Sequence, residues 1–88
     1  MKIIYRKKFL KQLAKVPSGT RVQIEKFVFE ELLNLSSVTE AGKIEKMKGY
    51  SIFYKARFSS YRVGMKLENE TLILMVVMDR KDIYKFFP

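Results

Sequence analysis

The feature that most constrains the fold is a run of alternating side chains just past the middle of the chain. Tyr54, Ala56 and Phe58 fall on one face of an extended strand, and Lys55 and Arg57 fall on the other. Alternation with a period of two is typical of a strand that buries one face and exposes the other. These residues therefore predict a β-strand with an apolar face and a basic face.

The alternation resumes after a short turn at Ser59-Ser60. One parity of the next strand is apolar and the other is basic around a glycine: Tyr61, Val63, Met65 and Leu67 against Arg62, Gly64 and Lys66. Such a hairpin would bury its apolar face and expose Lys55, Arg57 and Arg62. By pattern alone, the exposed cations form either an ordinary solvated surface or an anion-binding site. The tyrosines of the apolar parity, and Tyr50, are expected to pack in the core.

The rest of the chain predicts helices and strands around this hairpin. Ile3–Tyr5 is expected to form a strand, and a first helix is expected from about Lys7 to Val16. A second helix follows a break at residues 17–20 and runs to about Leu35. Residues 43–49 are expected to form an irregular basic connection. Three strands and a helical turn then follow, at about Tyr50–Phe58, Tyr61–Leu67, Thr71–Asp79 and Asp82–Phe87.

This order predicts a small α+β fold in which residues 1–88 form one domain. An N-terminal strand and an αα-hairpin precede a three-stranded antiparallel meander, which completes a four-stranded sheet, and a short C-terminal helical turn ends the chain. The helices are expected to pack on one face of the sheet. The last strand is apolar on both parities, which is typical of a central strand covered on both faces.

The composition removes several kinds of chemistry. The 88 residues include no cysteine and no histidine, so acid–base chemistry would depend on Lys, Arg, Tyr or carboxylates, and no zinc site built on Cys or His is expected. A net charge of +9 is typical of proteins that bind nucleic acid, an anionic membrane or an acidic partner. The longest apolar run, Leu72–Met78, is too short to span a membrane, so we expect a soluble, cytoplasmic protein with no membrane partner.

Three segments of the chain form a recognisable series: Lys46-Met47-Lys48-Gly49, then residues 54–62, then residues 79–84. They are similar, in this order, to Lys-Leu-x-Gly, Tyr-Arg-Ile-Arg-Val-Gly-Asp-Tyr-Arg and His-Arg-Arg-Asp-Val-Tyr of the RelE/ParE toxin superfamily of bacterial and archaeal toxin–antitoxin pairs. The similarity extends over nearly the whole chain, in the order and length of its elements. The chain therefore resembles a member of this superfamily, with a RelE-like fold.

For the RelE branch, the resemblance implies an mRNA interferase, which is a ribosome-dependent, metal-independent endoribonuclease. Such a toxin cleaves mRNA in the ribosomal A site and inhibits translation, and no cofactor is implied. Matched position by position, the family's catalytic residues correspond to Lys55, Arg57, Arg62, Arg80 and Tyr84. Two departures stand out, because Asp79 replaces a frequent histidine and Ser59-Ser60 replace Gly-Asp in the turn.

RNA can be cut without metal or histidine when its own 2′-hydroxyl attacks the adjacent phosphate. We expect Lys55 to act as base or electrostatic partner, and Arg57 and Arg62 to bind the phosphate. Arg80 is expected to stabilise charge or donate a proton. Tyr84 is expected to stack on a base or orient the hydroxyl, although its apolar neighbours alone are more typical of a core aromatic. Nearby lysines are expected to bind RNA: Lys46, Lys48, Lys66 and Lys81.

Three alternatives share much of this pattern. A ParE-like DNA gyrase poison would have the same fold but would act by binding a protein–DNA machine. A non-catalytic RNA-binding module would bind RNA with steep salt dependence and leave it intact, and an inactivated family member would cause no growth arrest. The presence of all five candidate residues favours the nuclease. Charge and resemblance together imply an acidic antitoxin, bound in a hetero-oligomer, and a target made of the ribosome and its mRNA.

Overall fold

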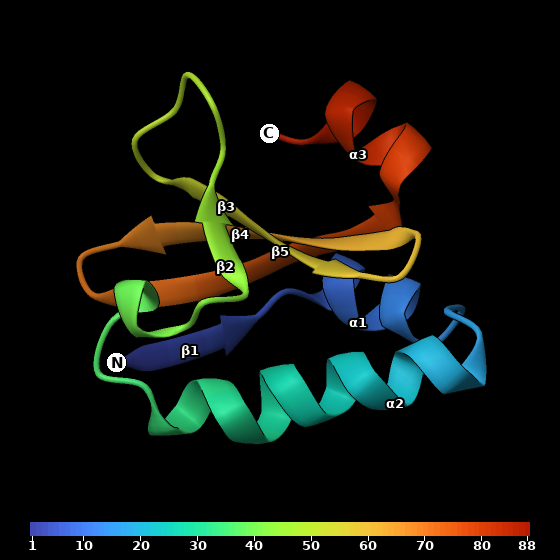
Figure 1. The fold of residues 1–88 in the computed structure, drawn as a ribbon, viewed down its shortest axis with the longest axis horizontal. Coiled ribbons are helices and arrows are strands. Elements are labelled where there is room, and N and C mark those ends of the chain that lie inside the picture. The colour runs from blue at the N-terminus through green and yellow to red at the C-terminus, as the bar shows by residue number, and fades with distance from the viewer.

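A computed structural model describes residues 1–88 and contains one mixed sheet of five strands (Figure 1). The strands are β1 (Lys2–Tyr5), β2 (Ile44–Lys46), β3 (Phe53–Phe58), β4 (Tyr61–Glu68) and β5 (Thr71–Asp79). The helices are α1 (Lys7–Leu13), α2 (Ser18–Lys26) and α3 (Arg80–Phe86). A π turn (Phe27–Glu31) and a 3-10 turn (Leu32–Asn34) continue α2, and a short 3-10 turn (Val38–Glu40) follows. The predicted α+β class is confirmed.

The strands lie in the order β1-β5-β4-β3-β2. β1 is parallel to β5, and the other neighbours are antiparallel. β5 is therefore an interior strand, as its unbroken apolar sequence predicts. One irregularity between Gly64 and Met65 shifts the register of β4 against β5, so that Met65 pairs with Leu74 and Gly64 pairs with Val76.

The expectation of four strands was wrong by one. Residues Ile44–Lys46, expected to be part of an irregular connection, form the edge strand β2 and pair with Ala56, Lys55 and Tyr54 of β3. Three residues at a sheet edge are too few to show a period-two pattern, and only Ile44 packs against the core. Strand β3 also begins three residues later than expected, because residues 47–52 form a loop that includes Gly49 at φ +86°.

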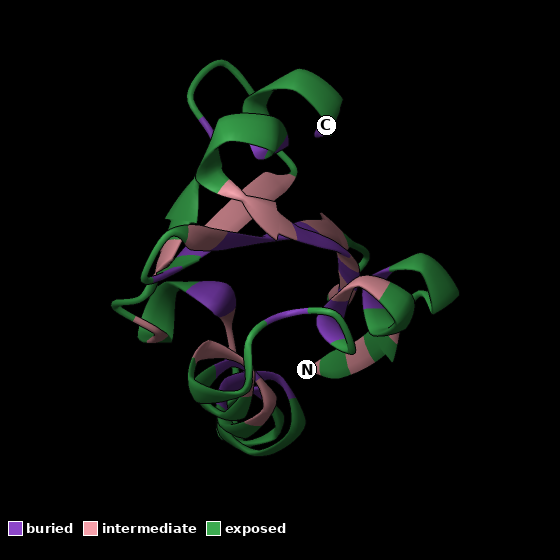
Figure 2. Cartoon of the chain, turned by 90° about the vertical axis from the view of Figure 1, so that its right-hand side faces the viewer, coloured by how far each residue is buried: buried purple, intermediate pink, exposed green.

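The larger core lies between the sheet and the layer formed by α1 and α2 (Figures 1 and 2). Fifteen buried apolar residues form this cluster. It includes Phe9 of α1, Ile24 of α2, Val63 of β4 and Leu74 of β5, each with 0% of its surface exposed. The alternation in β3 and β4 therefore buries the parity that the sequence predicts, with Tyr54 and Tyr61 packed at the margin of the cluster.

Helix α3 lies on the opposite face of the sheet, which corrects the expectation that all helices cover one face (Figure 1). Ile83 and Phe87 are buried there with Met47 and Val76 in a second cluster of four residues. Apolar spacing within a terminal helix indicates which of its residues are buried, but it does not indicate which face of the sheet they cover. Tyr50 lies in the loop before β3 and is half exposed, so its expected place in the core was wrong.

Gly64 gives Phe87 the room to reach the sheet. A Cβ atom built on Gly64 would lie 2.7 Å from the Phe87 ring and 2.9 Å from a methyl group of Val76, closer than real Cβ contacts allow. The bare backbone of β4 is therefore the surface on which the Phe87 ring rests. No helix in the structure is both long enough and apolar enough to cross a membrane.

Candidate functional site

The basic parity of the β3–β4 hairpin faces the same side of the sheet as α3. Lys55 and Arg57 project from β3 on this side and Arg62 projects from β4, with Arg57 directly opposite Arg62 in the register. Like charges directly opposite one another on a sheet repel and destabilise it unless something compensates. A bound anion would supply that compensation, so the pairing favours an anion-binding site over an ordinary solvated face.

Arg62 is held in place by the turn of the hairpin. Its Nη1 atom donates hydrogen bonds of 2.9 Å to the backbone oxygens of Ser59 and Tyr61. Only 8% of the residue is exposed, so the expectation that Arg62 would be an exposed cation was wrong. Ser59 adopts a positive φ of 56° in this turn, and its carbonyl accepts one of these hydrogen bonds. A guanidinium carries five N–H donors in a planar fork. Arg62 is therefore fixed in orientation and retains donors for a ligand.

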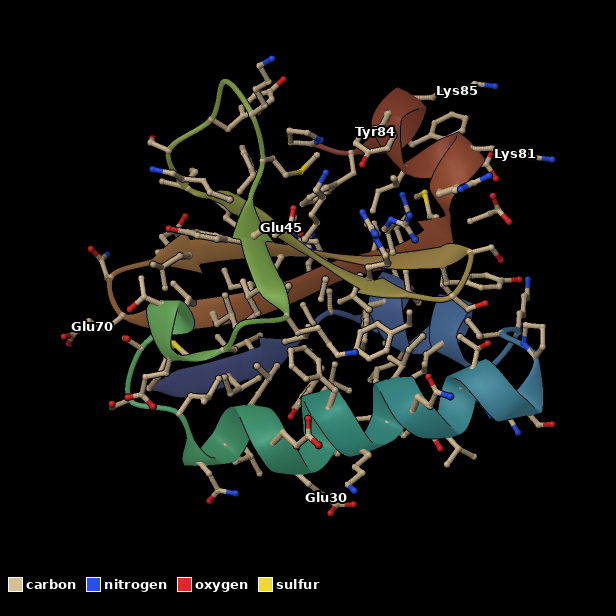
Figure 3. All side chains as sticks on the ribbon, viewed as in Figure 1. Glu30, Glu45, Glu70, Lys81, Tyr84 and Lys85 are labelled. Atoms are coloured by element: carbon tan, nitrogen blue, oxygen red, sulfur yellow. The ribbon has the colours of Figure 1, made fainter.

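Tyr84 extends from α3 toward the hairpin (Figure 3). The Lys55 Nζ atom donates a 2.8 Å hydrogen bond to the Tyr84 hydroxyl and lies 5.0 Å from the centre of its ring. This hydrogen bond lowers the pKa of Tyr84 below its ordinary value of 10.0. The charges of Lys55 and Arg62 lower the pKa further, and partial burial opposes the change. The alternative of a core tyrosine was wrong, because 58% of Tyr84 is exposed.

Glu45 is the residue of the site that the sequence did not indicate. It lies on β2 directly opposite Lys55, and together with Lys55, Arg57 and Arg62 it lines a small hollow of about 10 Å³. That volume is close to the space of one water molecule. Glu45 brings the only carboxylate to this cluster. The sequence did not predict the position of Glu45, because that position depends on β2, whose three residues were predicted to be an irregular connection.

Arg80 connects α3 to the hairpin turn. Its backbone N–H donates a 2.8 Å hydrogen bond to the Ser60 carbonyl, and its exposed side chain makes no hydrogen bond or ion pair within the protein. Arg80 lies one helical turn before Tyr84, so the two side chains leave the same face of α3. Asp79, at the position of the family's histidine, accepts a 2.9 Å hydrogen bond from the Lys81 N–H and thereby caps the helix.

The four lysines predicted to bind RNA do not gather at this cluster. Lys81 points away from Tyr84, on the outer side of α3 (Figure 3). Lys46 pairs with Tyr54 and so belongs to the parity that faces away from Lys55. Lys48 is exposed in the loop after β2. Lys66 lies on the same face of the sheet as Lys55 but forms an ion pair of 2.9 Å with Glu68.

We name Glu45, Lys55, Arg57, Arg62 and Tyr84 the hairpin cluster. The chain contains only two ion pairs, Arg21–Glu25 and Lys66–Glu68, and neither belongs to the cluster. Its cations are therefore not neutralised by ion pairs, although the chain carries 18 Lys and Arg residues. No group of three or more carboxylate, His or Cys side chains is arranged to hold a metal ion. The chemistry that the cluster offers is anion binding together with one proton acceptor and one phenol.

Comparison with known proteins places the chain among toxins. The family model for the ParE toxin of the type II toxin–antitoxin system parDE matches residues 3–84. Toxin RelE3 of Methanocaldococcus jannaschii is 38% identical over 89 residues, and the match covers 100% of both chains.

Solved structures agree with this placement. A chain of the RelB-RelE antitoxin–toxin complex from Methanococcus jannaschii is 36% identical with a TM-score of 0.79, and the match covers 97% of this chain and 99% of that one. A chain of the RelBE2 toxin–antitoxin complex from Mycobacterium tuberculosis shares the fold at 18% identity with a TM-score of 0.67, over 90% of this chain and 96% of that one.

Proposed function

This chain belongs to the RelE/ParE toxin superfamily, and from that membership we propose that it is a ribosome-dependent endoribonuclease that cleaves mRNA in the ribosomal A site. The observation that carries the proposal is the hairpin cluster, in which Tyr84 of α3 meets Lys55 beside Arg57 and Arg62. The cluster combines phosphate-binding cations with groups that can accept and donate protons. Those are the components that cleavage of RNA by its own 2′-hydroxyl requires.

In this reaction the 2′-oxygen of one nucleotide attacks the adjacent phosphorus, and the bond to the 5′-oxygen of the next nucleotide breaks. The products are a 2′,3′-cyclic phosphate and a 5′-hydroxyl. Negative charge grows on the phosphoryl oxygens as the 2′-oxygen approaches. Arg57 and Arg62 would stabilise that charge, because a guanidinium donates two parallel hydrogen bonds to phosphate and remains protonated. The anchored orientation of Arg62 supports this role.

Glu45 would accept the proton of the 2′-hydroxyl. A carboxylate can accept a proton, whereas ammonium and guanidinium groups act only as donors. Lys55 donates its hydrogen bond to the Tyr84 oxygen, which supports the second of its two expected roles, that of electrostatic partner.

Tyr84 would donate a proton to the leaving 5′-oxygen. The Tyr84 oxygen accepts a hydrogen bond from Lys55, so the O–H of Tyr84 remains free to donate its proton. The lowered pKa of Tyr84 makes it a stronger acid than an ordinary tyrosine. Arg80, on the same face of α3, would stabilise the charge on the phosphate.

The ribosome would supply the positioning that the free protein lacks. The hollow at the centre of the hairpin cluster holds no more than a water-sized group, and Arg57 and Tyr84 are exposed, so the protein alone does not enclose an RNA strand. Correct alignment of the attacking oxygen and the phosphate can contribute ~7–11 kcal/mol to a reaction of this kind. We therefore expect little cleavage of free RNA and rapid cleavage of mRNA held in the A site.

An acidic antitoxin is the proposed partner. The net charge of +9 and the exposed cations on the α3 side suit a partly disordered, acidic chain that folds over the toxin and covers the cluster. The relative with 36% identity was solved as a RelB-RelE antitoxin–toxin complex, which supports a hetero-oligomer here.

A ParE-like action on DNA gyrase is the second candidate, since the matching family model describes a ParE toxin. Induced expression in a bacterial host, followed by primer extension on cellular mRNA and by mapping of DNA breaks, separates the two. The endoribonuclease predicts mRNA cuts at codons in the A site and intact chromosomal DNA. Breaks in DNA with intact mRNA would identify a gyrase poison, and growth arrest with both nucleic acids intact would favour RNA binding without cleavage.

The contribution of individual residues is tested with purified ribosomes carrying a defined mRNA. Arg57→Ala and Arg80→Ala are the informative variants, because both side chains are exposed and make no hydrogen bonds within the protein. Each should lower the cleavage rate by roughly 10²-fold or more. Lys15→Ala, a matched loss of one exposed cation on the α1–α2 side, should retain the wild-type rate. If both cluster variants cleave as fast as Lys15→Ala, the proposed site is wrong.

A further inference from the structure

A second depression lies on the α3 side of the sheet, beside the hairpin cluster and not part of it. It is a groove of about 300 Å³ between the C-terminal end of the chain and the junction of β1 with α1. Its lining includes the apolar residues Phe53, Met75 and Phe86 and the cations Arg6, Lys8 and Lys66. A volume of this size is at the lower end of the range for small-ligand pockets. None of these residues has a role in the chemistry proposed above.

The ring of Phe87 separates the groove from the hairpin cluster. It rests on Gly64 and Val76, and Gly64 is the residue of β4 that pairs with Lys55 of β3. Phe53 lies two residues before Lys55 on the same face of β3, so the two sites are about 7 Å apart along the strand. A ligand that extends past Phe87 could occupy both sites at once.

The groove combines positive charge with an exposed aromatic ring. Its lining includes no acidic side chain, and of its three cations only Lys66 takes part in an ion pair, with Glu68 outside the groove. The Arg6 guanidinium lies 3.9 Å from the sulfur of Met75, so its charge lies next to the apolar part of the lining. Phe86 is 65% exposed, the largest exposure among the large apolar residues of the chain. The exposed ring lies next to two cations without acidic partners, so the groove suits a ligand that offers both a flat apolar face and negative charge.

We propose that this groove binds one base of single-stranded RNA, next to the phosphate held by the hairpin cluster. The base stacks on Phe86, and the neighbouring phosphate contacts Arg6 and Lys8. The inference rests on the proposed function, because it takes RNA as the ligand of the hairpin cluster. Stacking on an aromatic side chain together with a cationic track for the backbone is the general means by which proteins bind single-stranded nucleic acid.

RNA fits the groove better than a second ligand class, an acidic peptide. A peptide would need only charge and apolar contact, whereas a base also has a flat face that matches an exposed phenyl ring. The position of the groove, on the same strand as Lys55, matches a polymer whose units repeat along the sheet. The groove would thus hold a nucleotide that flanks the cut and would fix the register of the mRNA.

The test uses a six-nucleotide RNA that carries the fluorescent base 2-aminopurine and a 2′-deoxy sugar at the central position, so that it cannot be cut there. Stacking quenches 2-aminopurine, and fluorescence anisotropy reports affinity. Phe86→Ala should abolish the quenching and weaken binding roughly tenfold. The double variant Arg6→Gln/Lys8→Gln should reduce the salt dependence of log K by about 1.4, the value for two lost phosphate contacts on a single strand.

Matched controls separate a local effect from loss of charge or apolar surface. Leu33→Ala removes an exposed apolar side chain that follows α2, and Lys15→Gln/Lys26→Gln removes two exposed cations on the α1–α2 side. Both controls should keep the quenching and the salt slope of the wild-type protein. All the altered side chains are exposed, so the variants are expected to fold, and circular dichroism verifies this.

Two results would overturn the inference. One is unchanged quenching and affinity in Phe86→Ala. The other is a groove variant that binds an acidic Glu/Leu peptide more weakly but binds the oligonucleotide as the wild type does, which would identify a protein-docking groove. A parallel ribosome assay tests the proposed function separately. If the wild type cleaves mRNA on the ribosome but the groove variants bind RNA as the wild type does, only the assignment of the groove is wrong. If 2-aminopurine stacks in the groove but the wild type cleaves no mRNA, only the proposed nuclease activity is wrong.

Discussion

The sheet has two faces, and they are built in different ways. The face under α1 and α2 buries a cluster of fifteen apolar residues, whereas the face under α3 buries four. Next to those four lie the hairpin cluster, with its three cations and Tyr84, and the groove with the exposed ring of Phe86. The comparison shows how a domain of 88 residues can carry a reactive surface. One face provides most of the burial that stabilises the fold, so the other can remain partly open.

The largest expected effect is on stability, and it is measured at two fully buried residues of equal size on opposite faces of the sheet, Leu74 and Ile83. Leu74→Ala, in the core under α1 and α2, should cost about 4 kcal/mol, and Ile83→Ala, under α3, about 2 kcal/mol, because the smaller cluster can collapse onto the space. Urea unfolding followed by circular dichroism measures both free energies. Equal losses would show that the α3 face contributes as much to stability as the helix-covered face, and the comparison would fail.

The next expected effect is a slower reaction with unchanged stability. Glu45→Gln keeps the shape of an exposed side chain but removes its ability to accept a proton, so cleavage of ribosome-bound mRNA should slow by roughly 10²–10⁴-fold. The free energy of unfolding should remain within about 0.5 kcal/mol of the wild-type value.

Glu30→Gln, an exposed glutamate in the continuation of α2, is the matched control because it makes the same change of charge. It should cleave at the wild-type rate. A Glu45→Gln protein that is as active as Glu30→Gln would remove the carboxylate from the proposed mechanism.

A smaller effect is expected at the contact between Phe87 and the sheet. Gly64→Ala adds a methyl group where the Phe87 ring rests, so the ring must move, and we expect a loss of about 1–3 kcal/mol together with looser docking of α3. Hydrogen exchange of the α3 amides reports the docking. Gly19→Ala is the control, since a Cβ there meets no atom within 4 Å. Protection of α3 that is equal in the two variants would contradict the role assigned to Gly64.

The smallest effect is a change in titration. The hydrogen bond from Lys55 stabilises the charged form of Tyr84 and lowers its pKa, so Lys55→Met should move the ionisation of Tyr84 to higher pH, toward 10.0. Ultraviolet difference titration against the same protein with Tyr84→Phe isolates this group from the other four tyrosines. Lys26→Met should leave the titration unchanged. If the pKa of Tyr84 is the same in Lys55→Met as in the wild type, the hydrogen bond between Lys55 and Tyr84 does not persist in solution.

The sequence predicted the hairpin face well because two strands of six and eight residues are long enough to show their period. The parity of Lys55, Arg57 and Arg62 follows directly from that alternation. β2 was missed because three residues cannot show a period, and Glu45 was missed with it. The identity of the carboxylate beside Lys55 depends on the pairing of Ile44–Lys46 with β3, which is a tertiary contact between segments that carry no matching signal.

The position of α3 could be predicted only in part. Ile83 and Phe87 are buried as their apolar character predicts, but Tyr84 between them is exposed, because a helix that packs on one side presents the intervening residues to solvent. The groove had no sequence signal. It is formed by Arg6 between β1 and α1, by Lys8 of α1, and by residues of the sheet and of the end of the chain, and only the fold brings Arg6 near Phe86.

The parallel pairing of β1 with β5 has a consequence for how the protein is made. Lys2 pairs with Thr71, so β1 cannot join the sheet until the ribosome has synthesised β5. Contacts between residues so far apart in sequence form late and slow the folding of a domain. Until β5 emerges, β1 lacks its only neighbour in the sheet and remains unpaired. The order of synthesis thus delays completion of the sheet until β5 emerges.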